Sequence, residues 1–155
     1  MAVCHTKYLE DFLDEKTSDN LYRTLYESIK WEDGIKSKKT KPLGLEDDQA
    51  QLLLPYIFEA IHKLKPDWVK GYNILGIYLN LYEDGNEATP NHTHPKQHQI
   101  VISLGAERML KVGSKSFSMK NGSSIIFGGS IHGALKQQEV KQGKISIATF
   151  MLPVA

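Results

Sequence analysis

The spacing of apolar residues predicts a helix near the start of the chain. In the segment TSDNLYRTLYESIKW, Leu21, Leu25 and Ile29 recur every four residues and therefore lie on one helical face. Ser18 or Asp19 can cap the first turn, because short polar side chains accept hydrogen bonds from free backbone amides. The segment is expected to be an amphipathic helix whose apolar stripe packs on the rest of the fold.

A second helix is predicted around residues 54–64, where apolar residues again follow a helical period and Pro55 suits a first helical turn. The intervening residues 32–49, EDGIKSKKTKPLGLEDDQ, are polar and rich in glycine and proline. We expect this segment to be a loop.

From Tyr72 onward the apolar residues occur in short β-branched and aromatic segments that are typical of strands. These segments are YNILGIYLNLY, QIVISLG, RMLKVGSKSFSM, SSIIFGG and KISIATFML. Gly113-Ser114 is typical of a two-residue hairpin turn, and KNGSS predicts another turn. Two helices followed by six to eight antiparallel strands predict a mostly β fold, a double-stranded β-helix (jelly roll) backed by two helices. We expect one domain over residues 1–155, with helical support and a lid in 1–70 and the jelly-roll core in 71–155.

Composition supports an ordinary globular protein. Hydrophobic residues make up 41% of the 155 residues, and no apolar run is long enough to predict a transmembrane helix. The first residues lack the basic and apolar regions of a secretory signal. A single cysteine, Cys4, excludes an internal disulfide and a cysteine-based zinc cage. An intracellular, cytoplasmic location is the expectation.

The net charge of +1 conceals two oppositely charged parts. Residues 95–155 hold eight Lys and Arg against two Asp and Glu, a net +6, whereas residues 1–94 hold eleven against sixteen, a net −5. The basic part could bind an anionic ligand such as nucleic acid, or could simply carry solvated lysines on strand edges.

Histidines provide the candidate chemistry. In NHTHPKQHQIVISLG, residues 91–105, His92 and His94 are two positions apart, so on an extended backbone both imidazoles project to the same side. His132, which follows a predicted buried strand and a glycine pair, is the best candidate for a third metal ligand. Imidazole suits iron, zinc, copper and nickel alike. The alternatives are a His94–His98 pair on a helical turn and polar loop histidines that bind no metal.

Residues 8–151 resemble the AlkB family of iron(II)- and 2-oxoglutarate-dependent dioxygenases, through the N-terminal segment YLEDFLDEKTSDNLYRTLYESIKW and five motifs in order after it. They are NLYEDG at 80–85, HTH at 92–94, IVISLG at 100–105, NGSSIIFGGSIHGA at 121–134 and KISIATF at 144–150.

The resemblance implies a role for each matching residue. His92, His94 and His132 would bind Fe(II), and Asn80, Tyr82 and Lys144 would bind 2-oxoglutarate. The enzyme would use O2 to hydroxylate a C–H bond. By analogy with the family, its substrate would be an alkylated base in single-stranded or base-flipped DNA or RNA, which would be oxidatively demethylated.

The chain also departs from the AlkB pattern. His94 stands where the family has Asp, Lys144 where it has Arg, and Phe150 where it has a second Arg. Lysine gives up the bidentate fork with which arginine holds a carboxylate. Two other interpretations therefore remain open: a three-histidine metal oxygenase that does not use 2-oxoglutarate, and a lapsed AlkB-like protein retained as a binding module.

Overall fold

The structure is a computed structural model, and it describes residues 6–34 and 38–154. Cys4 and His5 lie outside the described residues. The helices are α1 (Glu15–Ser28) and α2 (Asp48–Leu64). The strands are β1 (Lys7–Leu9), β2 (Glu32–Asp33), β3 (Lys39–Leu43), β4 (Tyr72–Tyr82), β5 (Thr89–His92), β6 (His98–Gly105), β7 (Arg108–Val112), β8 (Lys115–Met119), β9 (Ser124–Phe127), β10 (His132–Ala134) and β11 (Lys144–Pro153).

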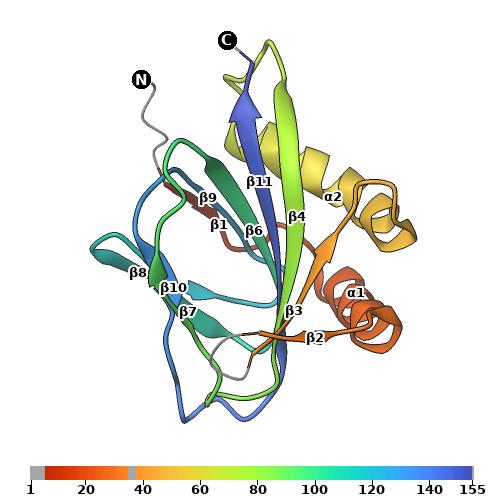
Figure 1. Ribbon diagram of the computed structural model, residues 1–155, viewed down its shortest axis with the longest axis vertical. Helices are drawn as coiled ribbons and strands as arrows, with labels where there is room; N and C mark the ends of the chain where they lie inside the picture. Colours follow the sequence, from red (N-terminus) through yellow and green to blue (C-terminus); the bar gives the residue numbers. More distant parts are fainter. Residues whose placement is uncertain (1–5, 35–37, 155) are drawn as a thin grey trace.

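The strands form two antiparallel sheets. The main sheet has the order β1-β9-β6-β11-β4-β3-β2, and the minor sheet has the order β5-β10-β7-β8. Both helices lie on the main sheet's outer side, away from the minor sheet (Figure 1). This is the predicted jelly roll backed by two helices. The predicted hairpin is also present, since Gly113 adopts a left-handed φ of 61° between β7 and β8.

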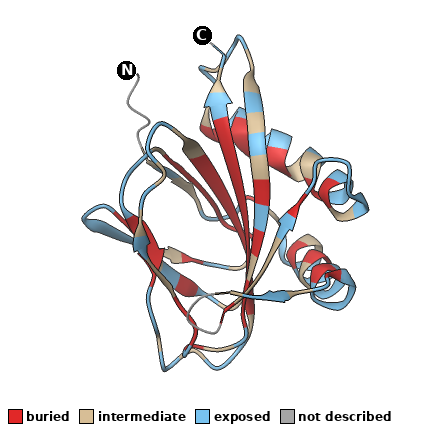
Figure 2. Cartoon of the chain, in the orientation of Figure 1, coloured by how far each residue is buried: buried red, intermediate tan, exposed pale blue. Residues whose placement is uncertain are grey.

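Alternation along the central strands separates the helix-packing core from the space between the sheets. On β11, Ile145 and Ile147 join the apolar cluster that includes Leu25 of α1 and Ile57 of α2. The residues between them, such as Ser146, point toward the minor sheet and line a cavity. Because both faces are covered, β6 and β11 are buried along nearly their whole length (Figure 2). These strands are buried on both faces, and they pack against the helices with one face and line the cavity with the other.

Both helices begin earlier than predicted. Asp14 caps α1 by accepting a 2.7 Å hydrogen bond from the Thr17 amide, whereas Ser18 is buried inside the helix. Helix α2 begins at Asp48, so Pro55 lies in its interior. Proline there removes one backbone hydrogen bond, and burial of the helix's apolar face against the main sheet offsets that loss. Neither helix in the described chain has the length and hydropathy needed to cross a membrane.

The prediction of a loop over residues 32–49 is wrong for residues 32–33 and 39–43, which form β2 and β3 of the main sheet, and for 48–49, which begin α2; residues 35–37 lie outside the described residues. Lys39, Thr40 and Lys41 pair with β4, and Lys41 forms a 2.7 Å ion pair with Glu32 of β2. β2 is the edge strand and consists of two acidic residues, and β3 beside it carries two lysines and a proline, so both lack the apolar alternation by which a strand is predicted.

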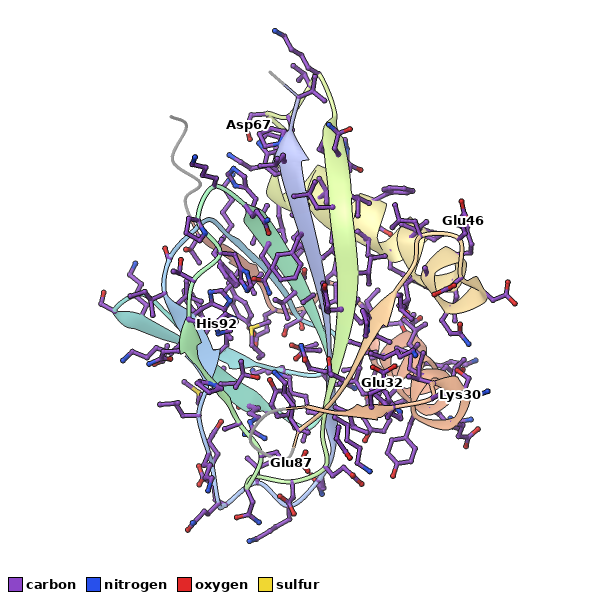
Figure 3. The ribbon with its side chains drawn as sticks, in the orientation of Figure 1. Lys30, Glu32, Glu46, Asp67, Glu87 and His92 are labelled. Carbon is purple, nitrogen blue, oxygen red and sulfur yellow. The ribbon has the colours of Figure 1, made fainter. Side chains whose placement is uncertain are left out.

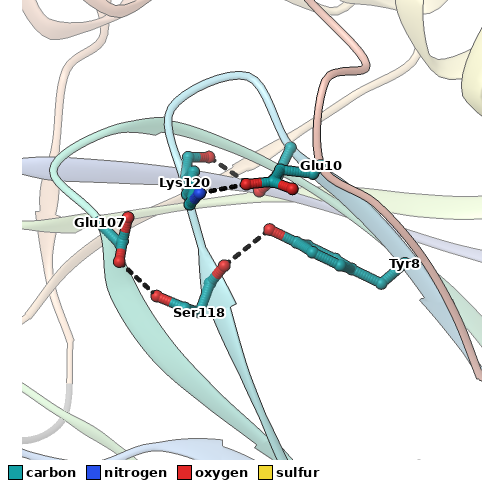
Figure 4. A network of polar contacts seen from close by, with 6 residues as sticks. Tyr8, Glu10, Glu107, Ser118 and Lys120 are labelled. Carbon is teal, nitrogen blue, oxygen red and sulfur yellow. Dashed lines mark hydrogen bonds and ion pairs between the residues drawn. The ribbon is translucent and has the colours of Figure 1, made fainter.

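A polar network joins one edge of the main sheet to one edge of the minor sheet (Figure 4). The Tyr8 hydroxyl next to β9 donates a 2.7 Å hydrogen bond to the Ser118 carbonyl of β8. Glu10 pairs with Lys120, and the Ser118 hydroxyl donates to Glu107. These contacts close the sandwich on the side opposite β5.

Candidate functional site

Three histidines, two on paired strands and one in the loop that follows β5, converge between the sheets. His92 ends β5 and His132 begins β10, and the two residues are directly paired across the minor sheet. His94 follows two residues after His92. One ligand nitrogen from each of the three lies within 4.8 Å of the others, a grouping that can hold one metal ion. The ring centroids are separated by 4.9 Å for His92–His94 and 4.4 Å for His92–His132.

Hydrogen bonds orient two of the imidazoles. The Nδ1 of His92 bonds to the Pro90 carbonyl at 2.7 Å, and the Nδ1 of His132 bonds to the Ser130 carbonyl at 2.9 Å. A carbonyl oxygen can only accept a hydrogen bond, so each ring carries a proton on Nδ1, which leaves Nε2 as the nitrogen through which a neutral ring could bind a metal. The backbone thus supplies the outer contact that commonly orients a metal-binding histidine.

The Nε2 atom of His132 is buried and has no hydrogen-bond partner among the residues that the structure describes. Burial, chiefly, lowers the pKa of His132 to about 4, and it also lowers the pKa of His94. Both rings are therefore neutral near pH 7, which is the form that binds a metal. A buried lone pair without a partner is unfavourable, and a metal ion in the triad would satisfy it.

Gly133 allows β5 and β10 to approach closely enough to bring His92 and His132 together. A Cβ on Gly133 would lie 2.5 Å from Asn91 Oδ1 and 2.9 Å from the Asn91 amide nitrogen. The glycine pair 128–129 that precedes His132 was expected to allow a sharp turn, but neither residue has a positive φ. Gly133, rather than that pair, is the glycine that the site requires.

The triad opens into a cavity of about 540 Å³ between the two sheets. This volume is within the range of small-molecule sites. His92, labelled in Figure 3, lies on the minor-sheet side of the molecule, away from both helices. The main-sheet wall includes inward residues of β4 and β11 that alternate along each strand with residues of the helix-packing core. These inward residues are Gly76, Tyr78, Asn80, Tyr82, Lys144, Ser146, Ala148 and Phe150, and Thr40 of β3 and Gln99 and Val101 of β6 also line the cavity.

Lys144 is a buried cation in this wall. Only 4% of its surface is exposed, and it forms no ion pair with a carboxylate in the described part of the chain. Burial is the main cause that lowers its pKa to about 7, and the nearby positive charge of Arg108 contributes. The cavity lining, as far as the chain is described, contains no Asp or Glu. An anionic ligand would compensate this charge.

Arg108 is even more buried, with 1% exposure, but it serves the scaffold. Its guanidinium lies 4.5 Å from the centre of the Tyr82 ring and donates to the carbonyls of Asp84, Glu87 and Leu135. These bonds hold the connections that flank β5 and β10. Arg108 and Lys144 were both counted in the basic C-terminal part, yet neither presents its charge on the surface.

The other predicted site residues also have clear positions. Asn80 and Tyr82 line the cavity, as does Phe150, whose ring packs 4.7 Å from His94. The alternative His94–His98 pair is wrong, because His98 instead packs 5.0 Å from Trp68 and is not part of the triad. Sequence analysis missed Lys38, a second buried lysine in the cavity lining. It lies in the KSKKTK run, whose composition is typical of an exposed loop.

Neither a protein-family model nor a curated protein matches this chain. Solved structures do match. A collagen prolyl hydroxylase of Paramecium bursaria Chlorella virus-1, in complex with 2-oxoglutarate, superposes with a TM-score of 0.71 at 14% identity, covering 99% of this chain and 100% of the viral one. The chain has the jelly-roll fold of that hydroxylase.

Two further structures share the fold. HygX from Streptomyces hygroscopicus, with nickel and 2-oxoglutarate bound, gives a TM-score of 0.73 at 8% identity over 98% of this chain and 84% of HygX. A Pseudomonas putida prolyl-4-hydroxylase gives 0.66 at 12% identity over 97% and 93% of the two chains. At these identities the similarity concerns the fold. It does not show the AlkB-like subfamily that the sequence motifs resemble.

Proposed function

We propose that the protein is an iron(II)- and 2-oxoglutarate-dependent oxygenase that hydroxylates a C–H bond of a second substrate. The observation that carries this proposal is a single cavity that contains both a three-histidine cluster and a buried lysine without an acidic partner. The histidine cluster suits a divalent metal. The lysine suits one carboxylate of a dicarboxylate whose other end would chelate that metal.

The donor set fits iron. His92, His94 and His132 would hold the ion through one imidazole nitrogen each. Three neutral imidazoles leave the full charge of the ion in place, whereas a carboxylate ligand would reduce it. Bound Fe(II) would supply the oxidising chemistry, in which O2 converts 2-oxoglutarate to succinate and CO2 while one oxygen atom enters the C–H bond.

The chain's own residues would bind and orient the co-substrate. The Lys144 ammonium would pair with the distal carboxylate of 2-oxoglutarate, away from the metal. Asn80 and Tyr82, on the neighbouring strand, would contact the same molecule with an amide and a hydroxyl. Phe150, beside His94, would exclude water from the histidine cluster. The solved structures that bind 2-oxoglutarate in this fold support the assignment.

Succinate formation tests the proposal. The purified protein is incubated with Fe(II), ascorbate and 2-oxoglutarate, and succinate is compared between the wild type and His132→Ala. We expect succinate from the wild type alone. Metal binding without succinate would favour the three-histidine oxygenase that does not use 2-oxoglutarate, and absence of metal binding would favour a lapsed binding module.

The AlkB-like assignment and an alkylated nucleobase as the substrate rest on the sequence motifs. The charge argument for nucleic acid is weaker than the sequence suggested. Removing buried Arg108 and Lys144 from the +6 of residues 95–155 leaves +4. Of the remaining lysines, Lys120 is paired with Glu10.

A further inference from the structure

Lys38 and Lys144 occupy the same end of the cavity, on either side of Tyr82. Lys144 is directly paired with Tyr82 across β11 and β4. On the other side of β4, Lys39 pairs with Leu81 and Thr40 pairs with Asn80, so the antiparallel register brings Lys38 opposite Tyr82. The register therefore places the three residues in one row across the main sheet, and all three line the cavity.

Hydroxyl groups complete this row. The Lys38 ammonium donates a 2.9 Å hydrogen bond to the Thr89 hydroxyl oxygen, which lies 2.5 Å from the Tyr82 hydroxyl. Lys38 is only 9% exposed, and burial lowers its pKa. The end of the cavity therefore contains two ammonium groups and two hydroxyl groups.

The positive charge of the two lysines is uncompensated. Neither lysine forms an ion pair with a carboxylate within residues 6–34 and 38–154. The next residue, Lys39, is different: its ammonium lies 3.2 Å from Glu83, and its side chain is 41% exposed. Two buried cations beside two hydroxyls, with no Asp or Glu among the described residues that line the cavity, are the chemistry of a carboxylate-binding site.

We propose that Lys38 and Lys144 together bind the distal carboxylate of 2-oxoglutarate, an inference that rests on the proposed function. Adjacent strands lie about 4.8 Å apart, so the two Cα atoms are separated by about 10 Å, and their long side chains can meet over Tyr82. Each ammonium binds one carboxylate oxygen. Two lysines thereby replace the two-point contact that a single arginine fork would make. Lys38 is a binding residue contributed by the position directly before β3.

Calorimetric binding of two ligands to the Mn(II)-loaded protein tests this role without catalysis. 2-Oxoglutarate carries the distal carboxylate, and 2-oxopentanoate has the same chain length without it. Lys38→Met is expected to raise the dissociation constant of 2-oxoglutarate by about ten- to a hundredfold, the effect of losing one charge-assisted bond. The same variant should leave 2-oxopentanoate binding unchanged. Lys39→Met, one residue away and outside the cavity, is the matched control and should change neither.

Lys38→Gln provides a second variant if Lys38→Met does not fold. An unchanged affinity for 2-oxoglutarate in a folded Lys38 variant would overturn the proposal, as would equal weakening of both ligands, which indicates a structural role alone. If the wild type binds no 2-oxoglutarate, the proposed function itself fails, and that result is distinct from both of these.

Discussion

Replacing Lys144 with methionine tests whether the cavity contains an uncompensated charge. Methionine is unbranched and of similar length, so it fills the same space without the ammonium. Lys144 is 4% exposed, and its pKa falls from 10.5 to about 7, mainly because it is buried. The variant should therefore be more stable than the wild type in the absence of ligand, although it loses a charged side chain.

The size of the effect depends on pH. Between about pH 7 and about pH 10 the unfolded chain holds a proton on Lys144 that the folded protein releases, so the free energy of unfolding rises with pH in this window. The slope is at most about 1.4 kcal/mol per pH unit, and the penalty below about pH 7 is about 4 to 5 kcal/mol. Lys144→Met removes both the penalty and this part of the slope.

Urea unfolding of the metal-free wild type and variant, from about pH 6 to about pH 9, measures the difference directly. The difference in the free energy of unfolding between variant and wild type should be largest at the acidic end and shrink as Lys144 loses its proton with rising pH. Other titrating groups are the same in both proteins, so their contributions cancel in this difference. Parallel stability curves, or a variant less stable than the wild type at every pH, would refute a desolvated, unpaired Lys144.

Three further predictions concern the metal shell, the scaffold and the substrate. His94→Asp should increase succinate formation in the 2-oxoglutarate assay, because it restores the carboxylate ligand of the AlkB pattern; a decrease would show that the three-histidine shell is the active one. Arg108→Met should lower the free energy of unfolding, measured by urea unfolding, by about 3 kcal/mol or more, because it leaves the carbonyls of Asp84, Glu87 and Leu135 without their hydrogen-bond donor. A change below about 0.5 kcal/mol would contradict the scaffold role of Arg108. Binding to a labelled single-stranded oligonucleotide, followed by fluorescence anisotropy, should weaken as salt rises; absence of binding at low salt would exclude nucleic acid as the substrate.

Much of the fold could be predicted because its signals are local. The helical period of Leu21 and Leu25 predicted α1, and the β-branched segments after Tyr72 predicted the jelly-roll strands. The strands β2 and β3 could not be predicted, since their stability comes from pairing at a polar end of the main sheet, where β3 pairs with β4 and β2 pairs with β3. A strand such as β3, which is polar both on its cavity face and on its other face, has no alternation of apolar and polar residues from which it could be predicted.

The site divides in the same way. The two-residue spacing of His92 and His94 predicted that both face one side, and a strand before His132 suggested the distant partner. Nothing in the KSKKTK run distinguishes buried Lys38 from exposed Lys39. Only the register with β4 does so, because alternation sends one lysine into the cavity and the next toward Glu83.

The central claim is that one metal ion at the histidine cluster and the lysine end of the cavity together hold a single 2-oxoglutarate molecule. A crystal structure of the protein with Mn(II) and 2-oxoglutarate tests it most directly. The account predicts one metal ion bonded to His92, His94 and His132, chelated by the 2-oxo acid end, with the distal carboxylate at Lys144. A metal bound elsewhere, or 2-oxoglutarate absent from the cavity at saturating concentration, would contradict it.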